Sequence, residues 1–256
     1  MSQPILQFGT SRFLQAHVDL FVSEALAGAN GAGSALGGIT LVQTTSSPDS
    51  AARVAALANG TGYPVRIRGK ISGEQIDRLV QCNGIHAALQ AATQWPQIRQ
   101  TMVNDVQVVV SNTADRGYQL DASDGPGLLA VGQPAPSSFP AKLLVLLHDR
   151  WQQRADAPLT LLPCELIENN GSVLRDLVVK LAQDWALPAA FTQWLQQHCV
   201  WVNSLVDRIV SEAIQPIGAV AEPYALWAIG RQNGMQLPCT HPAIVVTDDL
   251  AQHERL

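Results

Sequence analysis

Charged side chains are scarce in this chain of 256 residues: they make up 14% of it, and the formal net charge is −5. It has no basic stripe that would bind a phosphate backbone, so we do not expect a nucleic acid partner. No uninterrupted apolar run reaches the roughly 20 residues that span a bilayer. The first residues show neither a basic n-region nor a cleavage site. We therefore expect a cytoplasmic protein that acts on small molecules and has no membrane partner.

Cysteines are also few, and no two of them have CxxC spacing. They lie inside apolar segments, at Cys82, Cys164, Cys199 and Cys239. This pattern favours reduced core thiols over zinc ligands or disulfides. The six histidines show no metal-ligand spacing either, so no metal site is predicted. We expect His17 to be a helix-face or packing residue rather than a catalyst.

Apolar residues are plentiful, at 47% of the chain, which is enough for one large core or for one large and one small core. Continuous apolar runs predict buried strands at residues 5–8, 39–42, 64–67, 106–110 and 159–162. Helical spacing predicts helices from Phe13 to Gly28, through Ile85 and Ala92 with an end at Pro96, and around Leu143 to Trp151. This alternation predicts an α/β fold, Rossmann-like and doubly wound, with a mostly parallel sheet and helices on both faces.

The later part of the chain is harder to interpret. Ser172 is predicted to cap a helix, a short helix follows around Phe191, and residues 200–202 and 206–210 are strands or extended segments. We expect a dinucleotide-binding domain over residues 1–215. Residues 216–256 are predicted to be an irregular extension, with candidate strands at 219–221, around Trp227 and at 244–246.

The turn after the first strand is a candidate cofactor site. It reads Gly9-Thr10-Ser11-Arg12-Phe13, and a Rossmann fold presents the N–H groups of this turn to the cofactor pyrophosphate. The GxGxxG fingerprint is incomplete, because Ser11 and Leu14 replace its second and third glycines. The Cβ of Ser11 would lie close to the phosphate, whereas its hydroxyl could donate to it. An ordinary strand-to-helix turn, with Arg12 solvated, is the alternative.

A second candidate, Ser111-Asn112-Thr113, follows a buried strand. Ligands of open α/β sheets bind at this edge, so the segment is predicted to bind the nicotinamide ribose or amide. The alternative is a strand-end turn. Asp49 is the nearest acid after the second strand, and the small Ser46 and Ser47 would tolerate a 2′-phosphate. The choice between NAD and NADP therefore stays open.

Four segments in this order resemble the polyol-specific long-chain dehydrogenases, the family of mannitol dehydrogenase and the hexuronate reductases. They are Gln7 to Phe13, Ser111 to Thr113, Pro163 to Gly171 and Leu205 to Val210. The family has Gly-any-Gly-any-Phe in the first segment, from which Ser11 departs. Residues Asp115 to Tyr118 are similar to its acid-any-Gly-Tyr motif. The resemblance extends from about Pro4 to the end of the chain.

The resemblance also implies roles for later residues. Mannitol dehydrogenases have Cys-Asp-Asn in the third segment, and the Asn polarises the reacting oxygen. This chain has Cys164-Glu165-Leu166 at the same place, which is similar to the tagaturonate reductase (altronate oxidoreductase) branch. Leu166 cannot donate a hydrogen bond, so a donor from this segment would be Asn170 or a backbone N–H, and Glu165 would contact cofactor or substrate hydroxyls. The alternative is a polar loop. Asp207 would orient substrate or a catalytic side chain, unless it forms a structural ion pair with Arg208.

The family relationship implies an NAD(P)-dependent oxidoreductase that interconverts a secondary alcohol and a ketone of an open-chain polyol or hexuronate. Its mechanism uses a lysine as general base and requires no metal. Family members carry this lysine, with an Asn and a His, in a C-terminal helical domain, which would be the partner of this chain. We therefore expect the main catalytic residues to lie beyond Leu256, with Asn170 and Asp207 in supporting roles.

The lysines of the chain itself have no such setting. Lys70, Lys142 and Lys180 lack the Asn and His neighbours of the family's general base, so we expect the chain alone to be inactive. The alternative is a domain without catalytic function that binds a nucleotide or a partner.

Overall fold

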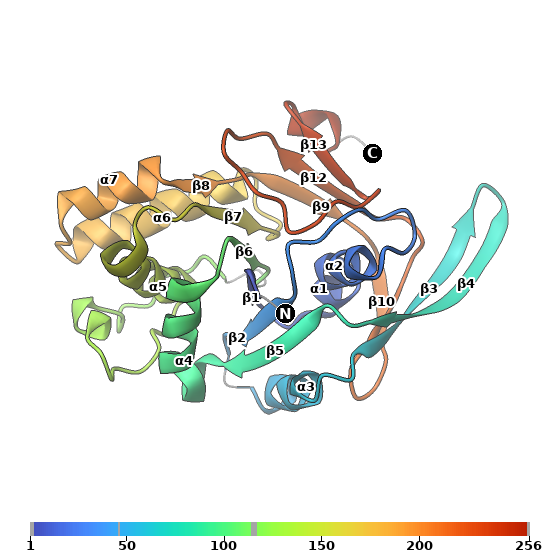
Figure 1. The fold of residues 1–256 in the computed structure, drawn as a ribbon, viewed down its shortest axis with the longest axis horizontal. Coiled ribbons are helices and arrows are strands. Elements are labelled where there is room, and N and C mark those ends of the chain that lie inside the picture. Colours follow the sequence, from blue (N-terminus) through green and yellow to red (C-terminus); the bar gives the residue numbers. More distant parts are fainter. Residues whose placement is uncertain (1–2, 46, 114–116, 255–256) are drawn as a thin grey trace.

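The computed structural model describes residues 3–45, 47–113 and 117–254 (Figure 1). At its centre is a six-stranded sheet in the order β5-β2-β1-β6-β7-β8, in which all neighbouring strands are parallel. Numbered within this sheet, the order is 3-2-1-4-5-6, the doubly wound order of dinucleotide-binding folds. The predicted fold class is confirmed. The strands are β1 (Ile5–Phe8), β2 (Ile39–Gln43), β5 (Ile85–Gln90), β6 (Val108–Ser111), β7 (Leu159–Pro163) and β8 (Cys199–Trp201).

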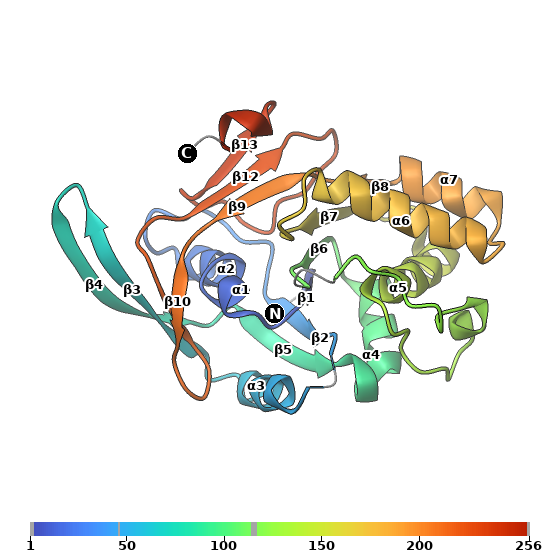
Figure 2. The same ribbon diagram turned by 180° about the vertical axis from the view of Figure 1, so that it is seen from behind.

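Helices cover both faces of this sheet (Figures 1 and 2). Side chains alternate along each strand, so Leu6 joins one core cluster and Ile5 the other. The first cluster packs under α4, α5, α6 and α7, and the second under α1, α2 and α3. The helices are α1 (Arg12–Gln15), α2 (Val18–Ala27), α3 (Pro48–Ala58), α4 (Ala91–Asn104), α5 (Phe139–Arg154), α6 (Asn170–Asp184) and α7 (Ala189–Gln197). Two short 3-10 helices span Pro126–Leu129 and Leu250–Gln252.

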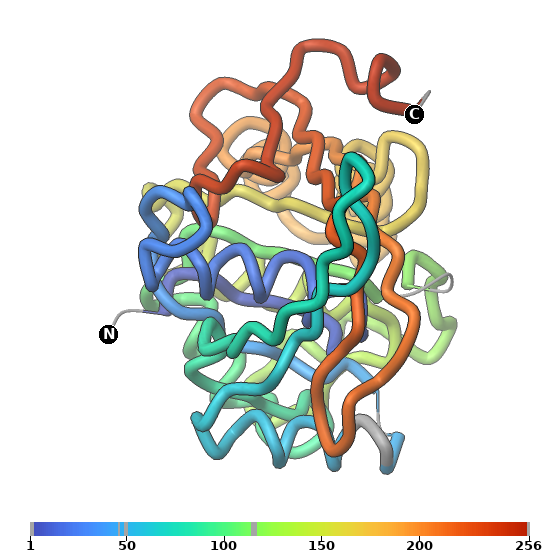
Figure 3. Tube along the Cα trace, turned by 90° about the vertical axis from the view of Figure 1, so that its right-hand side faces the viewer, coloured from blue at the N-terminus to red at the C-terminus, as the bar shows by residue number. Residues whose placement is uncertain are grey.

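Two smaller sheets flank the central one. The first has the order β10-β11-β3-β4 and contains a long hairpin, visible in Figure 3 beside β10 and β11. The second has the order β13-β12-β9. Their strands are β3 (Tyr63–Ile71), β4 (Glu74–Cys82), β9 (Ser204–Asp207), β10 (Val210–Ala213), β11 (Ala219–Ala221), β12 (Leu226–Gly230) and β13 (Ile244–Thr247).

The candidate strands after residue 216 are confirmed, so this segment is not the irregular extension that was predicted. Strand β11 pairs with β3, and β12 pairs with β9. Strands from both sides of residue 216 therefore share sheets. The division of the chain at residues 215 and 216 stays a prediction.

The helix predicted through Ile85 and Ala92 is wrong. Residues 85–90 form β5, whose partner is β2, and α4 begins only at Ala91. The apolar spacing fits a helix, but pairing with β2 overrides it. Pro96 does not end the helix either, because Gln94 has non-helical angles (φ −123°, ψ 27°) and the helix restarts after this kink. Proline is tolerated in a first turn, where its missing N–H is not needed.

Three further boundaries differ from the prediction. The first helix is broken: α1 ends at Gln15 and α2 begins at Val18, with His17 between them at φ −125° and ψ −99°. Helix α6 begins at Asn170, so Ser172 lies within its first turn instead of capping it. The extended segment 206–210 is divided between β9 and β10, because the chain passes from one small sheet to the other at Arg208.

The break at His17 has a specific cause. The His17 ring is fully buried, and its Nε2 lies 3.0 Å from the carbonyl oxygen of Leu226 on β12. It stacks on Phe13 with ring centroids 4.6 Å apart and also contacts Phe21 and Trp227. Burial lowers the pKa of His17 to about 3, so the ring stays neutral. The predicted packing role of His17 is confirmed.

The four cysteines are free and buried, as predicted. In the described part of the chain, no helix combines the length and the apolar character that crossing a membrane requires.

Asp19 on α2 should make stability depend on pH. It is fully buried, and the hydroxyl of Tyr63 donates to its Oδ2 at 3.0 Å. Burial raises the pKa of Asp19 from 3.8 to about 7. Because the folded-state pKa lies above the unfolded value, the protein binds more protons when folded, and this contribution to stability is lost as the pH rises from about 4 to about 7.

We expect Asp19→Asn to remove this part of the pH dependence and to raise the free energy of unfolding at pH 8 by about 1–3 kcal/mol. Urea unfolding at pH 5 and pH 8 measures both effects, with the exposed Asp105→Asn as the control. If the Asp19→Asn variant kept the pH slope of the original chain, buried Asp19 would not be the titrating group.

Candidate active site at the carboxyl edge of the sheet

The turn after β1 brings the ends of β1 and β6 unusually close together. Gly9 has φ +115°, and a Cβ on it would lie 2.3 Å from the carbonyl oxygen of Asn112. The Asn112 N–H donates to the carbonyl of Phe8 at 3.0 Å, and the Gly9 N–H donates to that of Val42 at 3.0 Å. Only glycine permits this approach. The junction lies where the strand order reverses, which is the ligand-binding position of doubly wound sheets.

Ser11 caps the short helix α1. Its hydroxyl accepts from the Leu14 N–H at 3.2 Å and donates to the Asn112 side-chain oxygen at 3.3 Å. Thr10 is buried, Arg12 is exposed, and Phe13 is half-buried against His17. Because α1 has only four residues, a long helix dipole does not point at this turn. The donors that the turn offers an anion are the backbone N–H groups of residues 10–13, because the Gly9 N–H and the Ser11 hydroxyl donate to Val42 and Asn112.

Glu165 joins the ends of β6 and β7. It is 4% exposed, and its carboxylate accepts hydrogen bonds from the Ser111 hydroxyl (3.0 Å), the Thr113 N–H (3.1 Å), the Thr113 hydroxyl (2.9 Å) and the Tyr118 hydroxyl (3.3 Å). Burial raises the pKa of Glu165, although the hydrogen bonds from Ser111 and Thr113 oppose the shift. In this conformation both carboxylate oxygens bind protein donors. Glu165 therefore holds Thr113 in place.

Asn112 lies between the two strand ends. Its side-chain N–H donates to the carbonyl of Cys164 at 2.8 Å, and its side-chain oxygen accepts from Ser11. The side chain is half-buried. Asn112 thus connects the turn at Ser11 with the segment that follows β7.

Asn170 ties two loops together. Its side-chain nitrogen lies 3.1 Å from the carbonyl oxygens of Pro163 and Glu165 and 3.0 Å from that of Ser204. Its side-chain oxygen accepts from the N–H groups of Gly171 (2.9 Å) and Ser204 (3.0 Å). At 1% exposed, the amide is occupied by backbone groups. The observed contacts make Asn170 a residue that positions the loops.

Asp207 and Arg208 face different surroundings. Asp207 is exposed at the end of β9, whereas Arg208 is 9% exposed. The Arg208 guanidinium donates to the carbonyls of Ala16 (2.5 Å) and Glu222 (2.8 and 3.1 Å). Burial lowers the pKa of Arg208 to about 10. Among the described residues, no ion pair joins Asp207 to Arg208. The structural ion pair that was the alternative role for Asp207 is therefore not seen.

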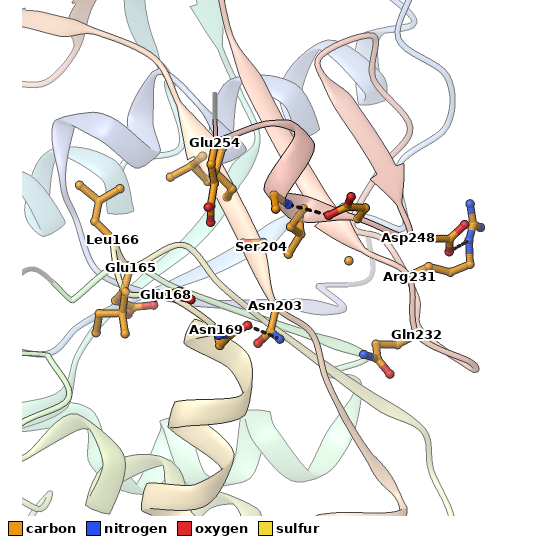
Figure 4. A pocket seen from close by; sticks show the side chains of 17 residues that line it. Glu165, Leu166, Glu168, Asn169, Asn203, Ser204, Arg231, Gln232, Asp248 and Glu254 are labelled. Carbon is orange, nitrogen blue, oxygen red and sulfur yellow. Dashed lines mark hydrogen bonds and ion pairs between the residues drawn. The ribbon is translucent and has the colours of Figure 1, made fainter. Parts of the chain in front are cut away.

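A cavity of about 650 Å³ opens beside this network (Figure 4). Its walls are the loop after β7, the start of β9, the end of β12 and the 3-10 helix at Leu250. Five acidic residues line it, and the cation Arg231 is paired with one of them, Asp248, at 2.9 Å. The acids are Glu165, Glu168, Asp248, Asp249 and Glu254. Apart from Glu165, whose oxygens already bind protein donors, these carboxylates can accept hydrogen bonds from a polyhydroxylated molecule. Leu166 lies on the wall and is 84% exposed.

The structure thus brings most of the predicted residues together. Gly9, Ser11 and Asn112 meet at one junction, while Ser111, Thr113, Glu165 and Asn170 belong to the adjoining network. Among the described residues, no hydrogen bond joins the side chain of Arg12 or Asp207 to that network.

Some of the sequence predictions fall on residues that the structure does not describe. Asp115 and Arg116 lie outside the described residues, as does Ser46, and the side chain of Asp49 is not described. Leu256, beyond which the catalytic lysine, asparagine and histidine are expected, also lies outside the described residues. The placement of those three catalytic residues after Leu256 therefore stays a prediction.

Sequence reasoning missed the role of Ser204. Its hydroxyl donates to the Pro163 carbonyl at 2.6 Å, and its backbone is held by Asn170. The polar pair Asn203-Ser204, directly before an apolar strand, was the available signal. Within residues 3–45, 47–113 and 117–254, no group of three or more His, Cys, Asp or Glu side chains is arranged to hold a metal ion.

Comparison with protein-family models identifies residues 3–238 as a mannitol dehydrogenase Rossmann domain. The chain is 30% identical over 249 residues to the altronate oxidoreductase of Halalkalibacterium halodurans, covering 90% of this chain and 46% of that protein. It is 29% identical over 257 residues to the altronate oxidoreductase of Bacillus subtilis, covering 92% and 51%. The chain thus spans about half the length of these relatives.

Two solved structures share the fold of almost the whole chain. A D-sorbitol dehydrogenase in substrate-free form aligns with a TM-score of 0.80 at 19% identity, over 99% of this chain and 55% of its own. Mannitol 2-dehydrogenase of Pseudomonas fluorescens, in a ternary complex with NAD and D-mannitol, aligns with a TM-score of 0.79 at 19% identity, over 98% and 54%. The resemblance found in the four sequence segments is therefore confirmed: the chain belongs to the mannitol dehydrogenase family and comprises its Rossmann domain.

Proposed function

We propose that this chain is the cofactor-binding part of an NAD(P)-dependent oxidoreductase, which interconverts a secondary alcohol and a ketone of an open-chain polyol or hexuronate. The observation that carries the proposal is the junction of Gly9 with Asn112. There the backbones of Gly9 and Asn112 approach each other closely, where the strand order of a 3-2-1-4-5-6 sheet reverses. The turn from Thr10 to Phe13 offers backbone N–H groups at this edge, so the residues present fit the pyrophosphate of a bound dinucleotide.

In this proposal the N–H groups of residues 10–13 bind the pyrophosphate, because that of Gly9 donates to Val42. The Ser11 hydroxyl adds a donor when it turns away from Asn112. Asn112 and Thr113 bind the nicotinamide ribose or amide, with Thr113 held in position by Glu165. The nicotinamide, when bound, supplies the hydride acceptor. The residues of this chain bind and orient it. The choice between NAD and NADP stays open in the proposal.

The proposed substrate is a hexuronate of the altronate or tagaturonate kind. Two curated relatives are altronate oxidoreductases, and Leu166 replaces the asparagine of the mannitol branch. The acidic cavity suits hydroxyl groups, whereas a substrate carboxylate needs cations, and among the described residues that line the cavity the paired Arg231 is the one cation. Those cations would come from the remaining part of the protein. A role of Asp207 in orienting the substrate stays a prediction, since Asp207 follows the wall residues Leu205 and Val206 but does not itself line the cavity. A cytoplasmic location stays a prediction.

We expect the purified chain to bind NAD(H) or NADP(H). The reason is that residues of this chain alone form the turn, the strand ends and the buried network, and these lie close together. Isothermal calorimetry, or the fluorescence of the reduced nicotinamide, measures the affinity. A folded sample that binds neither cofactor at millimolar concentration would refute the cofactor proposal.

We further expect the chain alone to have no appreciable dehydrogenase activity, because the general base is proposed to lie beyond Leu256. Lys142 is buried and donates to the Ser137 carbonyl at 2.7 Å, and Lys180 pairs with Asp184. Neither they nor Lys70 line the cavity. A positioned base is typically worth about 10²- to 10⁴-fold in rate. Assays with polyols and aldonates, before and after adding the C-terminal half of an altronate oxidoreductase, test this.

Turnover by the chain alone at ordinary enzyme rates would show that the base lies within it. No gain on adding the other half, despite cofactor binding, would instead favour a nucleotide-binding domain without catalysis.

A further inference from the structure

The hairpin of β3 and β4 projects from the rest of the molecule (Figures 1 and 2). Strand β4 stands at the end of its sheet, in the order β10-β11-β3-β4, so within the described residues only β3 pairs with it. Apolar side chains are accessible on this arm: Leu79 is 68% exposed and Ile71 48%. Ile71 belongs to β3 and Leu79 to β4. A nine-residue edge strand with an accessible apolar side chain is a surface on which another strand can pair.

The turn of the hairpin determines which backbone groups face outward. Ser72 and Gly73 both have positive φ, at 49° and 87°, as in a two-residue type I′ turn, and Ile71 pairs with Glu74. Residues that flank such a turn exchange hydrogen bonds, and the pattern then alternates along the strand. The N–H and C=O groups of Glu74, Ile76 and Arg78 therefore face β3. Those of Gln75, Asp77 and Leu79 face outward.

The side chains of β4 are complementary to those of a second, antiparallel copy. In a twofold arrangement centred on Ile76, Glu74 lies opposite Arg78 of the second copy, and symmetry repeats the pair. The outward-facing groups of Gln75 and Asp77 meet as a hydrogen-bonded pair, and the two Ile76 side chains lie against each other. Opposite-charge and apolar cross-strand pairs are both stabilising.

Neighbouring registers lack the Glu74–Arg78 pairs. A twofold axis at Gln75 sets Glu74 opposite Ile76 of the second copy. A twofold axis at Asp77 sets two aspartates against each other, and an axis at Arg78 does the same with two arginines, which is destabilising. The Arg66–Asp77 ion pair of 2.7 Å crosses the hairpin on its other face. Arg78 donates to the Asn30 side-chain oxygen at 3.0 Å.

We propose that the outer edge of β4 is an interaction surface for a second copy of this chain, paired antiparallel about Ile76. Charged residues on an edge strand often serve to prevent pairing. The spacing of Glu74 and Arg78 about Ile76 favours pairing over prevention of pairing, because opposite charges meet in the proposed register.

Sedimentation equilibrium of the chain and of charge-reversed variants tests the proposal. We expect a concentration-dependent dimer, and we expect Glu74→Arg or Arg78→Glu alone to weaken it at least about tenfold. The double variant Glu74→Arg/Arg78→Glu should restore the dimer, because the two charges of each pair are exchanged and opposite charges meet again. The matched control is Glu212→Arg, the same charge change on β10 at the opposite edge of the sheet, which should leave dimerisation unchanged.

A further variant tests the backbone pairing. Gln75→Pro removes an outward N–H without removing a hydrogen bond to β3, and it should also weaken the dimer. Circular dichroism verifies that each variant is folded. A monomer at all concentrations would overturn the proposal. A dimer insensitive to Glu74→Arg and to Gln75→Pro, or one that the double variant fails to restore, would overturn it as well.

Discussion

Replacing Gly9 with alanine is expected to lower cofactor affinity by at least about a hundredfold and to destabilise the fold by about 1–3 kcal/mol. The backbone at this position has φ +115°, and the added Cβ would lie 2.3 Å from the Asn112 carbonyl oxygen. The turn must therefore move away from β6, and the donors of the turn then separate from Asn112 and Thr113. Calorimetric titration and urea unfolding of the same variant measure the two effects.

Gly28→Ala is the matched control. Gly28 also has positive φ, at +61°, but nothing lies within 4 Å of a Cβ built on it. It should lose only the roughly 1–2 kcal/mol of left-handed strain and keep its affinity for the cofactor. Equal loss of affinity in both variants would show that the effect of Gly9→Ala is general destabilisation rather than loss of the site.

Asn170→Ala is expected to lower the free energy of unfolding by about 3–5 kcal/mol, because several buried backbone groups lose their partner at once. The side chain contacts the carbonyls of Pro163, Glu165 and Ser204 and two N–H groups. Water cannot easily replace it, since the site is 1% exposed. The loop at one wall of the cavity should also move, which weakens nicotinamide binding.

The neighbouring Asn169→Gly is the control for this variant. Asn169 is exposed, caps α6 without a side-chain cap hydrogen bond and has φ 54°, which glycine adopts readily. We expect a change below about 1 kcal/mol. Asn170→Asp keeps the acceptor and loses the donors, so its stability should fall almost as far as that of Asn170→Ala. Little change in Asn170→Ala would assign the loop geometry to other contacts.

The buried parallel strands could be predicted because strands covered on both faces consist of continuous apolar residues. Residues 5–8, 39–42 and 159–162 are of this kind. Strand β5 could not be predicted in this way, because Ile85 and Leu89 fit a helical period and only the pairing with β2 makes the segment a strand. The hairpin of β3 and β4 has alternating exposed residues, and its sheet is completed by β11, about 140 residues later in the chain.

The location of the candidate site could be predicted, but not what each residue does there. Carboxyl ends of neighbouring parallel strands meet at one edge, so Gly9, Ser111 to Thr113 and Glu165 had to lie close together. The sequence does not show that Glu165 accepts from Thr113 and Tyr118, or that Asn170 turns toward Ser204. These side-chain orientations depend on hydrogen-bond partners that are 34 to 52 residues away in the sequence.

The buried ring of His17 also bears on how a molecule would be enclosed. It stacks on Phe13, which ends the turn proposed to hold the phosphates, and contacts Leu226 on β12, the strand whose far end lines the cavity at Gly230. Burial lowers the pKa of this ring to about 3, so the contact involves an uncharged ring at neutral pH. A single buried side chain thus joins the turn proposed to hold the phosphates to a strand that lines the cavity.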